Sequence, residues 1–331
     1  MRSVFYAALE NMTVYKRRFN SILPSAIAAM TVVLTGCGTA NNSLKAIAQE
    51  KPQIVASHSV LCNFIATIAQ DTVDLTCMME GGQDPHTYRP TPSERKALES
   101  ARVIYYGGYN LEPSIISLIE AVDSDVAKIA VHEAVVTDPI MAEHHHEEEA
   151  HLEADPHIWH DVRNAIATVE YLQSTLLQLN PNQATTYLEN SAQLIEELKQ
   201  LHVWVQEQIA TIPESKTLVT THSGLNYYVR AYELEYLTLQ GLSPDDAPSA
   251  ADLRNLVAEI RQTGVPTIFA EATKSDGVIN TVAREAGVKV SSQELYVDGL
   301  SAPGTDTDSY TEMIRHNTCA IVGGLGGECF R

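Results

Sequence analysis

Short apolar runs alternate with amphipathic stretches along most of the chain after Pro52. Runs of four to eight apolar residues are typical of buried strands, whereas apolar positions spaced by three and four are typical of helices. In the first half, this pattern predicts strands over 53–56, 73–79, 103–106 and 127–131 and helices over 60–70, 92–100 and 111–121, the second helix capped near Thr91.

The same alternation returns after Pro213. It predicts strands over 217–221, 234–239, 267–270 and 288–291 and helices over 224–232, 250–263, 276–286 and 308–322. Strands that alternate with helices form mostly parallel sheets covered by helices. The sequence therefore predicts an α/β fold with two lobes, each a mostly parallel sheet flanked by helices.

A long helical segment separates the two halves. Helical periodicity begins after His160, stops at Asn180-Pro181, and then runs from about Gln183 to Ile209 without glycine or proline. At 1.5 Å per residue, this second helix would be about 40 Å long. We expect an N-terminal lobe over 51–182, a rigid connecting helix within 183–212 and a C-terminal lobe over 213–331.

Residues 139–154 interrupt the alternation. They include an acidic, histidine-rich stretch over 143–151, which is too polar to pack and predicts a loop. Dense imidazoles and carboxylates can form weak cation sites, but a solvated insertion has the same composition. An auxiliary weak metal-binding role is expected for His144, His145, His146 and His151.

The first 36 residues have the pattern of an export signal. A basic group at 16–18 precedes an apolar stretch from Ile22 to Leu34, which is short for a membrane span. The stretch ends in Leu34-Thr35-Gly36-Cys37, which resembles a bacterial lipobox with Cys37 as the lipidated residue. Translation could begin at Met12. Residues 37–50 are small and polar and predict a flexible tether.

Composition narrows the function classes. The chain has 331 residues and a formal net charge of −20. Such a surface repels nucleic acid and attracts cations, although it also simply favours solubility. No stretch after the signal is apolar for about 18 residues, so we expect a soluble body held to the membrane only by lipid. We also expect a monomer.

Four cysteines follow Cys37 in the chain. An even number of cysteines in an exported protein indicates disulfides, and four cysteines allow three pairings. We favour the two pairings that close short loops. These join Cys62 to Cys77 and Cys319 to Cys329.

The tripeptide Asp-Pro-His occurs twice, each time in a segment that leads into a predicted helix. One copy ends at His86, in GGQDPHTYRP at 81–90, and the other ends at His157, in DPHIW at 155–159. Proline stiffens the chain beside each imidazole, which lowers the cost of holding a ligand in place. Asp84 and Asp155 are expected to stiffen these loops rather than to bind metal.

Two further candidates follow predicted strands of the second lobe. They are His222, at the end of a strand, and Asp298, between apolar residues and a glycine. Three imidazoles and one carboxylate suit a borderline cation such as Zn²⁺. His160 is an alternative to His157, and Glu271 could hold a ligating imidazole from behind or cap a helix.

Together these motifs resemble those of the zinc- and manganese-binding receptors of ABC importers, a family whose members were also described as adhesins. The resemblance covers essentially residues 50–331 and rests on the lipobox, the two histidine motifs, the long helix and the positions of His222 and Asp298. It implies one ion held between two α/β lobes by His86, His157, His222 and Asp298. It also implies partners: an importer's membrane permease and its cytoplasmic ATPase.

The third ligand position bears on the metal. Manganese receptors of this family usually have glutamate there and many zinc receptors have histidine, so His222 favours one Zn²⁺ as the transported ligand, with Mn²⁺ as the alternative. We expect no enzyme, because four protein ligands leave no open position and no H-E-x-x-H or G-x-S-x-G motif is present. A surface adhesin and a zinc-dependent hydrolase are the alternative functions. The expected location is the periplasmic or cell-surface face of the membrane.

Overall fold

A computed structural model describes residues 50–122, 125–146, 149–213, 215–242 and 248–330, with no side-chain description for 143–151 and 276. The predicted signal segment, Cys37 and most of the tether lie outside these residues. Contacts join residues from Gln49 onward into one unit. Among the described residues, no helix has the length and apolar character needed to cross a membrane.

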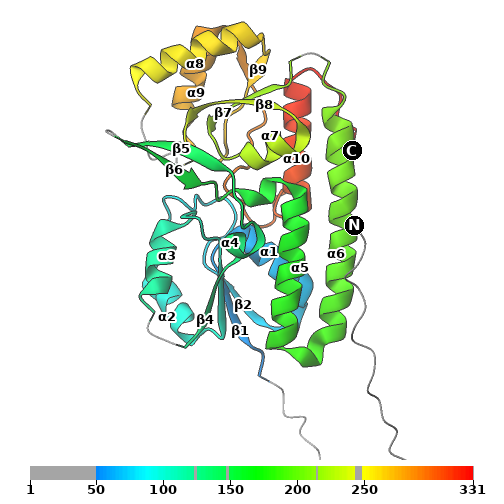
Figure 1. Cartoon of the computed structure of the whole chain (residues 1–331). Coiled ribbons are helices and arrows are strands. Elements are labelled where there is room, and N and C mark those ends of the chain that lie inside the picture. Colours follow the sequence, from blue (N-terminus) through cyan, green and yellow to red (C-terminus); the bar gives the residue numbers. More distant parts are fainter. Residues whose placement is uncertain (1–49, 123–124, 147–148, 214, 243–247, 331) are drawn as a thin grey trace, which may run out of the picture. The chain divides into compact units, whose positions relative to one another are not determined.

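The first lobe is built on a four-stranded parallel sheet with the strand order β2-β1-β3-β4 (Figure 1). Its strands are short, and they pair in parallel because helices connect them. The central strands β1 and β3 are mostly buried, as the apolar runs predict, whereas the edge strands β2 and β4 are partly exposed. The elements are β1 (Gln53–Ala56), α1 (Ser59–Ala69), β2 (Asp74–Cys77), α2 (Pro92–Ser100), β3 (Val103–Tyr106), α3 (Pro113–Glu120), β4 (Ala127–Ala130) and α4 (Val131–Val135).

Helix α2 shows how local signals fix a boundary. The Thr91 side chain accepts a hydrogen bond from the Glu94 backbone, the Glu94 carboxylate accepts one from the Thr91 backbone, and Pro92 occupies the first turn. Helix α4 was not predicted, because Val131 looked like the end of the preceding strand. Its five residues are too few to show helical periodicity.

The prediction of an irregular polar loop over 139–154 is wrong, because most of these residues form two strands. Residues Met141–His146 (β5) and Glu149–Ala154 (β6) form an antiparallel hairpin, with Met141 opposite Ala154. An antiparallel ladder satisfies backbone groups without burying side chains, so a polar composition does not prevent it. The base of the hairpin is held by a bond from the Asp155 backbone N–H to the Ile140 carbonyl, at 2.8 Å.

The second lobe contains two parallel pairs, β7–β8 and β9–β10. A hydrogen bond of 2.9 Å from the Phe269 N–H to the Val219 carbonyl links one pair to the other. The elements are β7 (Thr217–His222), α7 (Asn226–Tyr232), β8 (Glu235–Gln240), α8 (Ala250–Thr263), β9 (Thr267–Ile268), α9 (Asp276–Ala286), β10 (Lys289–Val290) and α10 (Tyr310–Gly324).

Helices α5 (Val162–Leu179) and α6 (Ala184–Ile209) lie side by side (Figure 1). Helix α6 packs against α1 and α5 and also against α10, so it supports elements of both lobes. Its buried positions Leu194, Leu198, Leu201 and Val205 recur every three or four residues and form one apolar stripe. The fold is therefore the α/β arrangement of two lobes with one long helix that the pattern predicts.

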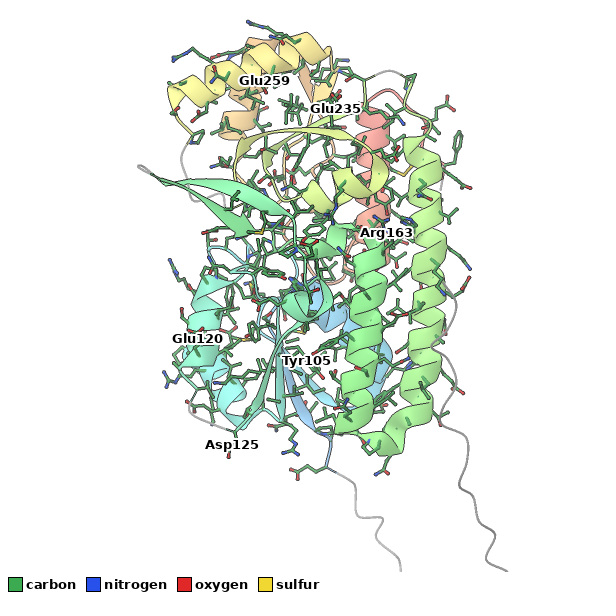
Figure 2. The ribbon with its side chains drawn as sticks, viewed as in Figure 1. Tyr105, Glu120, Asp125, Arg163, Glu235 and Glu259 are labelled. Carbon is green, nitrogen blue, oxygen red and sulfur yellow. A yellow bond between two sulfur atoms is a disulfide. The ribbon has the colours of Figure 1, made fainter. Side chains whose placement is uncertain are left out.

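Two disulfides tie helices to their neighbours. Cys62 of α1 is bonded to Cys77 at the end of β2, and Cys319 of α10 is bonded to Cys329 near the C-terminus. These are the two pairings that the sequence analysis favoured. Acidic side chains such as Glu120, Asp125 and Glu259 are exposed, whereas Tyr105 is fully buried (Figure 2).

Candidate metal centre

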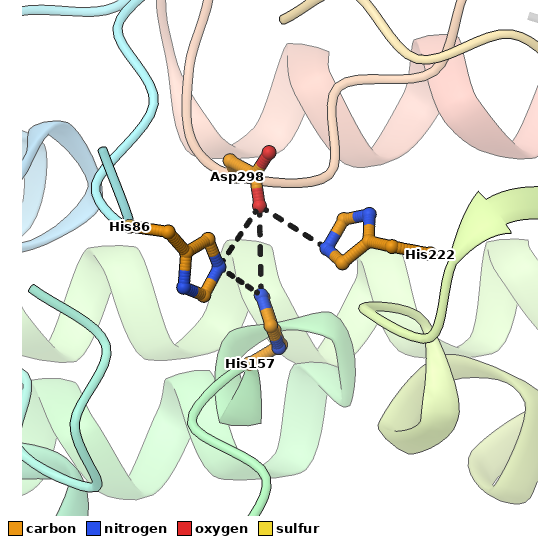
Figure 3. A group of neighbouring side chains, drawn as sticks. All are labelled: His86, His157, His222 and Asp298. Atoms are coloured by element: carbon orange, nitrogen blue, oxygen red, sulfur yellow. Dashed lines mark hydrogen bonds and ion pairs between the residues drawn. The ribbon is translucent and has the colours of Figure 1, made fainter. Parts of the chain in front are cut away.

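Four side chains from separate segments converge on one point (Figure 3). His86 lies in the loop between β2 and α2, and His157 immediately precedes the short 3-10 helix Ile158–His160. His222 is the last residue of β7, and Asp298 lies in the loop between β10 and α10. The structure thus brings together the four candidates taken from the two predicted lobes.

The donor atoms have the spacing of a small coordination shell. Asp298 Oδ1 lies 3.5 Å from Nε2 of His86, 3.5 Å from Nε2 of His157 and 3.3 Å from Nε2 of His222. The ligand atoms of all four residues lie within 4.8 Å of one another. An ion with ligands at 2.0–2.1 Å in a tetrahedron would separate them by about 3.3 Å. The arrangement fits one tetrahedral transition-metal ion.

All four side chains are buried. His222 Nε2 and Asp298 Oδ1 have no hydrogen-bond partner among the described residues, although buried polar atoms are normally satisfied. Both atoms face the other imidazoles, where a cation would satisfy them. The chemistry of this donor set is therefore that of a cation site.

Two of the imidazoles are held from behind by carboxylates. His157 Nδ1 lies 2.9 Å from Asp155 Oδ1, and His222 Nδ1 lies 2.5 Å from Glu271 Oε2. Glu271 Oε1 also accepts hydrogen bonds from the backbone N–H groups of Thr221 and His222, at 2.9 Å each. Such contacts fix the tautomer and leave Nε2 free to bind metal.

These surroundings shift the pKa values of the imidazoles in different directions. Burial lowers the pKa of His222, but Glu271 and Asp298 outweigh it and raise that pKa to about 10. Burial also lowers the pKa of His157, but Asp155 and Asp298 outweigh it and raise the pKa above its usual value. Burial prevails at His86 and lowers its pKa. Burial raises the pKa of Asp298, but the imidazoles, His222 foremost, hold it well below its usual value.

Close backbone contacts bring the loops of the site together. A Cβ atom on Gly81 would lie 1.8 Å from the Ser301 carbonyl oxygen, so only glycine allows the His86 loop to lie against the segment that follows Asp298. A Cβ on Gly224 would lie 2.6 Å from His222 Nε2. These two glycines leave room for the site.

Other residues from the sequence analysis have different positions. His160, the alternative to His157, places its Nε2 2.7 Å from the Val297 carbonyl oxygen and is not among the four converging groups. The structure does not describe the side chains of the four hairpin histidines, so their weak metal binding stays a prediction. They are His144, His145, His146 and His151.

Three residues around the site were missed or only partly understood from sequence. Asp155 was expected only to stiffen its loop, yet it also contacts the His157 ring. Thr273 and Lys274, which both bond Asp298 Oδ2, were not among the predicted site residues. The Asp-Pro-His repeat marks both aspartates as close enough to reach the ring of the following histidine, but it does not distinguish Asp155, which makes this contact, from Asp84, which pairs with Lys274 instead. Thr273 and Lys274 have no comparable local signal.

Comparisons with known proteins identify relatives that are named as metal-binding proteins. Residues 54–324 match the family described as zinc-uptake complex component A, periplasmic. The chain is 30% identical over 308 residues to the manganese-binding lipoprotein MntA of Bacillus subtilis, covering 92% of this chain and 98% of that protein. It is 29% identical over 301 residues to the manganese ABC transporter substrate-binding lipoprotein ScaA of Streptococcus gordonii, covering 89% and 95%.

Solved structures give the same result. The periplasmic zinc-binding protein TroA of Treponema pallidum superposes with a TM-score of 0.76 at 29% identity, covering 83% of this chain and 99% of that one. A manganese-bound periplasmic metal-binding protein from Candidatus Liberibacter asiaticus superposes with a TM-score of 0.71 at 26% identity, covering 83% and 100%. The family match spans most of the chain, and the chain belongs to the zinc-uptake complex component A, periplasmic, family.

Proposed function

We propose that this protein captures one divalent transition-metal ion outside the cytoplasm and delivers it to an ABC importer. The observation that carries the proposal is the convergence of three Nε2 atoms and one carboxylate oxygen in a buried site. In this proposal, His86, His157, His222 and Asp298 replace the waters of the hydrated ion. Two α/β lobes braced by α6 hold these ligands in place.

The importer would supply a membrane permease and a cytoplasmic ATPase as partners. The relatives named as substrate-binding lipoproteins of ABC transporters support this assignment. Lipid attachment at Cys37 would keep the protein at the periplasmic or cell-surface face of the membrane, close to its permease. We propose that it acts as a monomer and that it carries out no catalysis, in keeping with relatives named as binding proteins.

Zinc is the favoured ion. Names of relatives do not decide the metal, because they include both zinc-binding and manganese-binding proteins. The donor set does favour zinc, since three nitrogens and one oxygen suit a softer ion better than they suit manganese. His222→Glu should shift the preference towards manganese, because it replaces a nitrogen donor with a harder oxygen donor.

The test is elemental analysis of protein purified without added metal, followed by competition between Zn²⁺ and Mn²⁺. One tightly bound ion per chain is expected. His86→Ala and Asp298→Ala should each abolish tight binding while leaving the circular dichroism spectrum unchanged, since both residues lie in loops. Near-normal affinity in both variants would refute the site.

A further inference from the structure

The two carboxylate oxygens of Asp298 have different surroundings. Oδ1 faces the three imidazoles and accepts no hydrogen bond within the described part of the chain. Oδ2 points the other way and accepts two hydrogen bonds. One comes from the Thr273 hydroxyl at 2.8 Å and the other from the Lys274 ammonium group at 2.9 Å.

The ammonium group on Oδ2 is itself held in place. The Lys274 side chain is only 9% exposed, and it also forms an ion pair with Asp84 Oδ2. Asp84 belongs to the loop of His86, where its Oδ1 accepts a hydrogen bond of 3.0 Å from the His86 backbone N–H. Lys274 therefore links the two loops that carry His86 and Asp298, and it cannot turn away from Asp298 without breaking its ion pair with that buried carboxylate.

We infer that Thr273 and Lys274 hold Asp298 as a one-oxygen ligand and thereby give the site its preference for zinc over manganese. This inference rests on the proposed function and adds to it a determinant of the metal that none of the four ligands provides alone. Thr273 and Lys274 act through Asp298 and are positioning residues.

Asp298 cannot bind a metal through both oxygens without losing the hydrogen bonds to its Oδ2. If Asp298 bound a metal through both oxygens, Oδ2 would have to turn its lone pairs from Thr273 and Lys274 towards the ion. Hydrogen bonds to buried charged groups are strong, and leaving them unmade is costly. With Oδ2 occupied, the protein offers three nitrogens and one oxygen, which is the four-coordinate shell that Zn²⁺ prefers.

Manganese gains most from the freed oxygen. Mn²⁺ prefers oxygen donors and, in octahedral sites, more ligands than zinc has in a tetrahedral site. The positive charge of Lys274 should weaken the binding of either divalent ion to a similar degree. The ratio of the two affinities, rather than either affinity alone, therefore reports the role proposed here.

The experiment compares wild type with Thr273→Val, Lys274→Met and the double variant. In the double variant, the ratio of zinc affinity to manganese affinity should fall by on the order of tenfold or more. The ratio for each single variant should lie between those of wild type and the double variant. Co²⁺ provides a second readout, because it absorbs visible light strongly when four-coordinate and weakly at higher coordination. Absorbance per bound cobalt should therefore fall in the double variant.

Three matched controls separate hydrogen bonding from charge and from folding. Thr273→Ser and Lys274→Arg keep a donor and should restore the wild-type ratio and cobalt spectrum. Lys199→Met removes a positive charge from an exposed position of α6 and should change neither. If the double variant does not fold, the affinity ratio and cobalt spectrum of Thr273→Val decide the test, because this variant leaves every charge in place.

Several outcomes would overturn the inference. An unchanged zinc-to-manganese ratio with an unchanged cobalt spectrum, in variants that still bind tightly, would overturn it while leaving the proposed function intact. A shift in Lys199→Met as large as that in Lys274→Met would also overturn it, because charge alone would then be the cause. If wild type binds neither metal tightly, the proposed function fails and this inference fails with it.

Discussion

The two Asp-Pro-His segments have the same sequence and the same local turn but different roles at the site. In both, the aspartate Oδ1 accepts a hydrogen bond from the histidine backbone N–H, at 3.0 Å for Asp84 and 2.8 Å for Asp155. Asp155 is fully buried and also contacts the ring of His157. Asp84 is half-buried and pairs instead with Lys274.

This difference comes from the surroundings rather than from the tripeptide. Asp155 follows the hairpin, and its Oδ2 accepts a hydrogen bond of 3.0 Å from the Asn226 side chain at the start of α7. Asp84 has Lys274 of the second lobe as its neighbour. A repeated motif thus predicts the shape of the backbone, while tertiary contacts decide which side chain supports the imidazole.

The largest expected effect is that of pH on metal affinity. An imidazole must lose its proton to bind metal, and a pKa of about 10 means that His222 holds a proton at neutral pH in the metal-free protein. The raised pKa of His157 makes that imidazole harder to deprotonate than a free one. The pKa of His86 is lowered, so it holds none. Zinc must then displace the proton of His222, so affinity should fall by about tenfold per pH unit on acidification, and more steeply at pH values where His157 is also protonated.

Calorimetry in buffers of different ionisation enthalpy measures this release directly. We expect proton release near pH 7.5 that decreases above pH 10, the titration of His222. Asp155→Asn should reduce the release because it removes a carboxylate that raises the pKa of His157, whereas Asp84→Asn should not. A pH-independent affinity would contradict the assignment of His157 and His222 as ligands.

The next largest effect is that of Asp155→Asn on affinity at fixed pH. Loss of a carboxylate behind a ligating imidazole costs roughly 10–100-fold in metal affinity, because the ring is less basic and less firmly oriented. Competition with a chromophoric chelator measures the zinc affinity of the variant and of wild type. Asp161→Asn is the matched control, since Asp161 is also buried but caps α5 and pairs with Arg163. An equal loss in both variants would indicate a folding effect.

A smaller effect is expected from Asp84→Asn. The asparagine side-chain oxygen can still accept the hydrogen bond from the His86 backbone, which is the contact that Asp84 makes with His86. Only the ion pair with Lys274 is lost, so zinc affinity should change by no more than about threefold, within the range of a partly exposed ion pair. A loss as large as that of Asp155→Asn would mean that the two segments act alike.

The parts of the molecule that sequence predicted well are those with local signals. Helix α2 has its proline, its capping threonine and its glutamate within four residues, and the predicted range matches the observed one. Candidate ligands could be nominated in the same way, because His222 ends a strand and His86 follows one. Contacts between side chains that are far apart in the sequence could not be predicted. The ion pair of Lys274 with Asp84 spans 190 residues, and no periodicity marks either end of it.

The hairpin before Asp155 gives the smallest expected effect. Its base orients Asp155 through the bond to the Ile140 carbonyl, and the Ile140 N–H donates to the Tyr227 hydroxyl at 3.1 Å. Its tip lies farther along the ladder, beyond the pair of Glu143 with Leu152. Replacing 144–151 with an Asn-Gly turn keeps that pair and the base, and Asn-Gly suits a two-residue hairpin. Stoichiometric tight zinc binding should therefore be unchanged, and only weakly bound ions, counted by equilibrium dialysis, should decrease. Loss of the tight zinc site would show that residues 144–151 supply a ligand. Metal binding by His157 would then require the hairpin as well as the Asp-Pro-His segment.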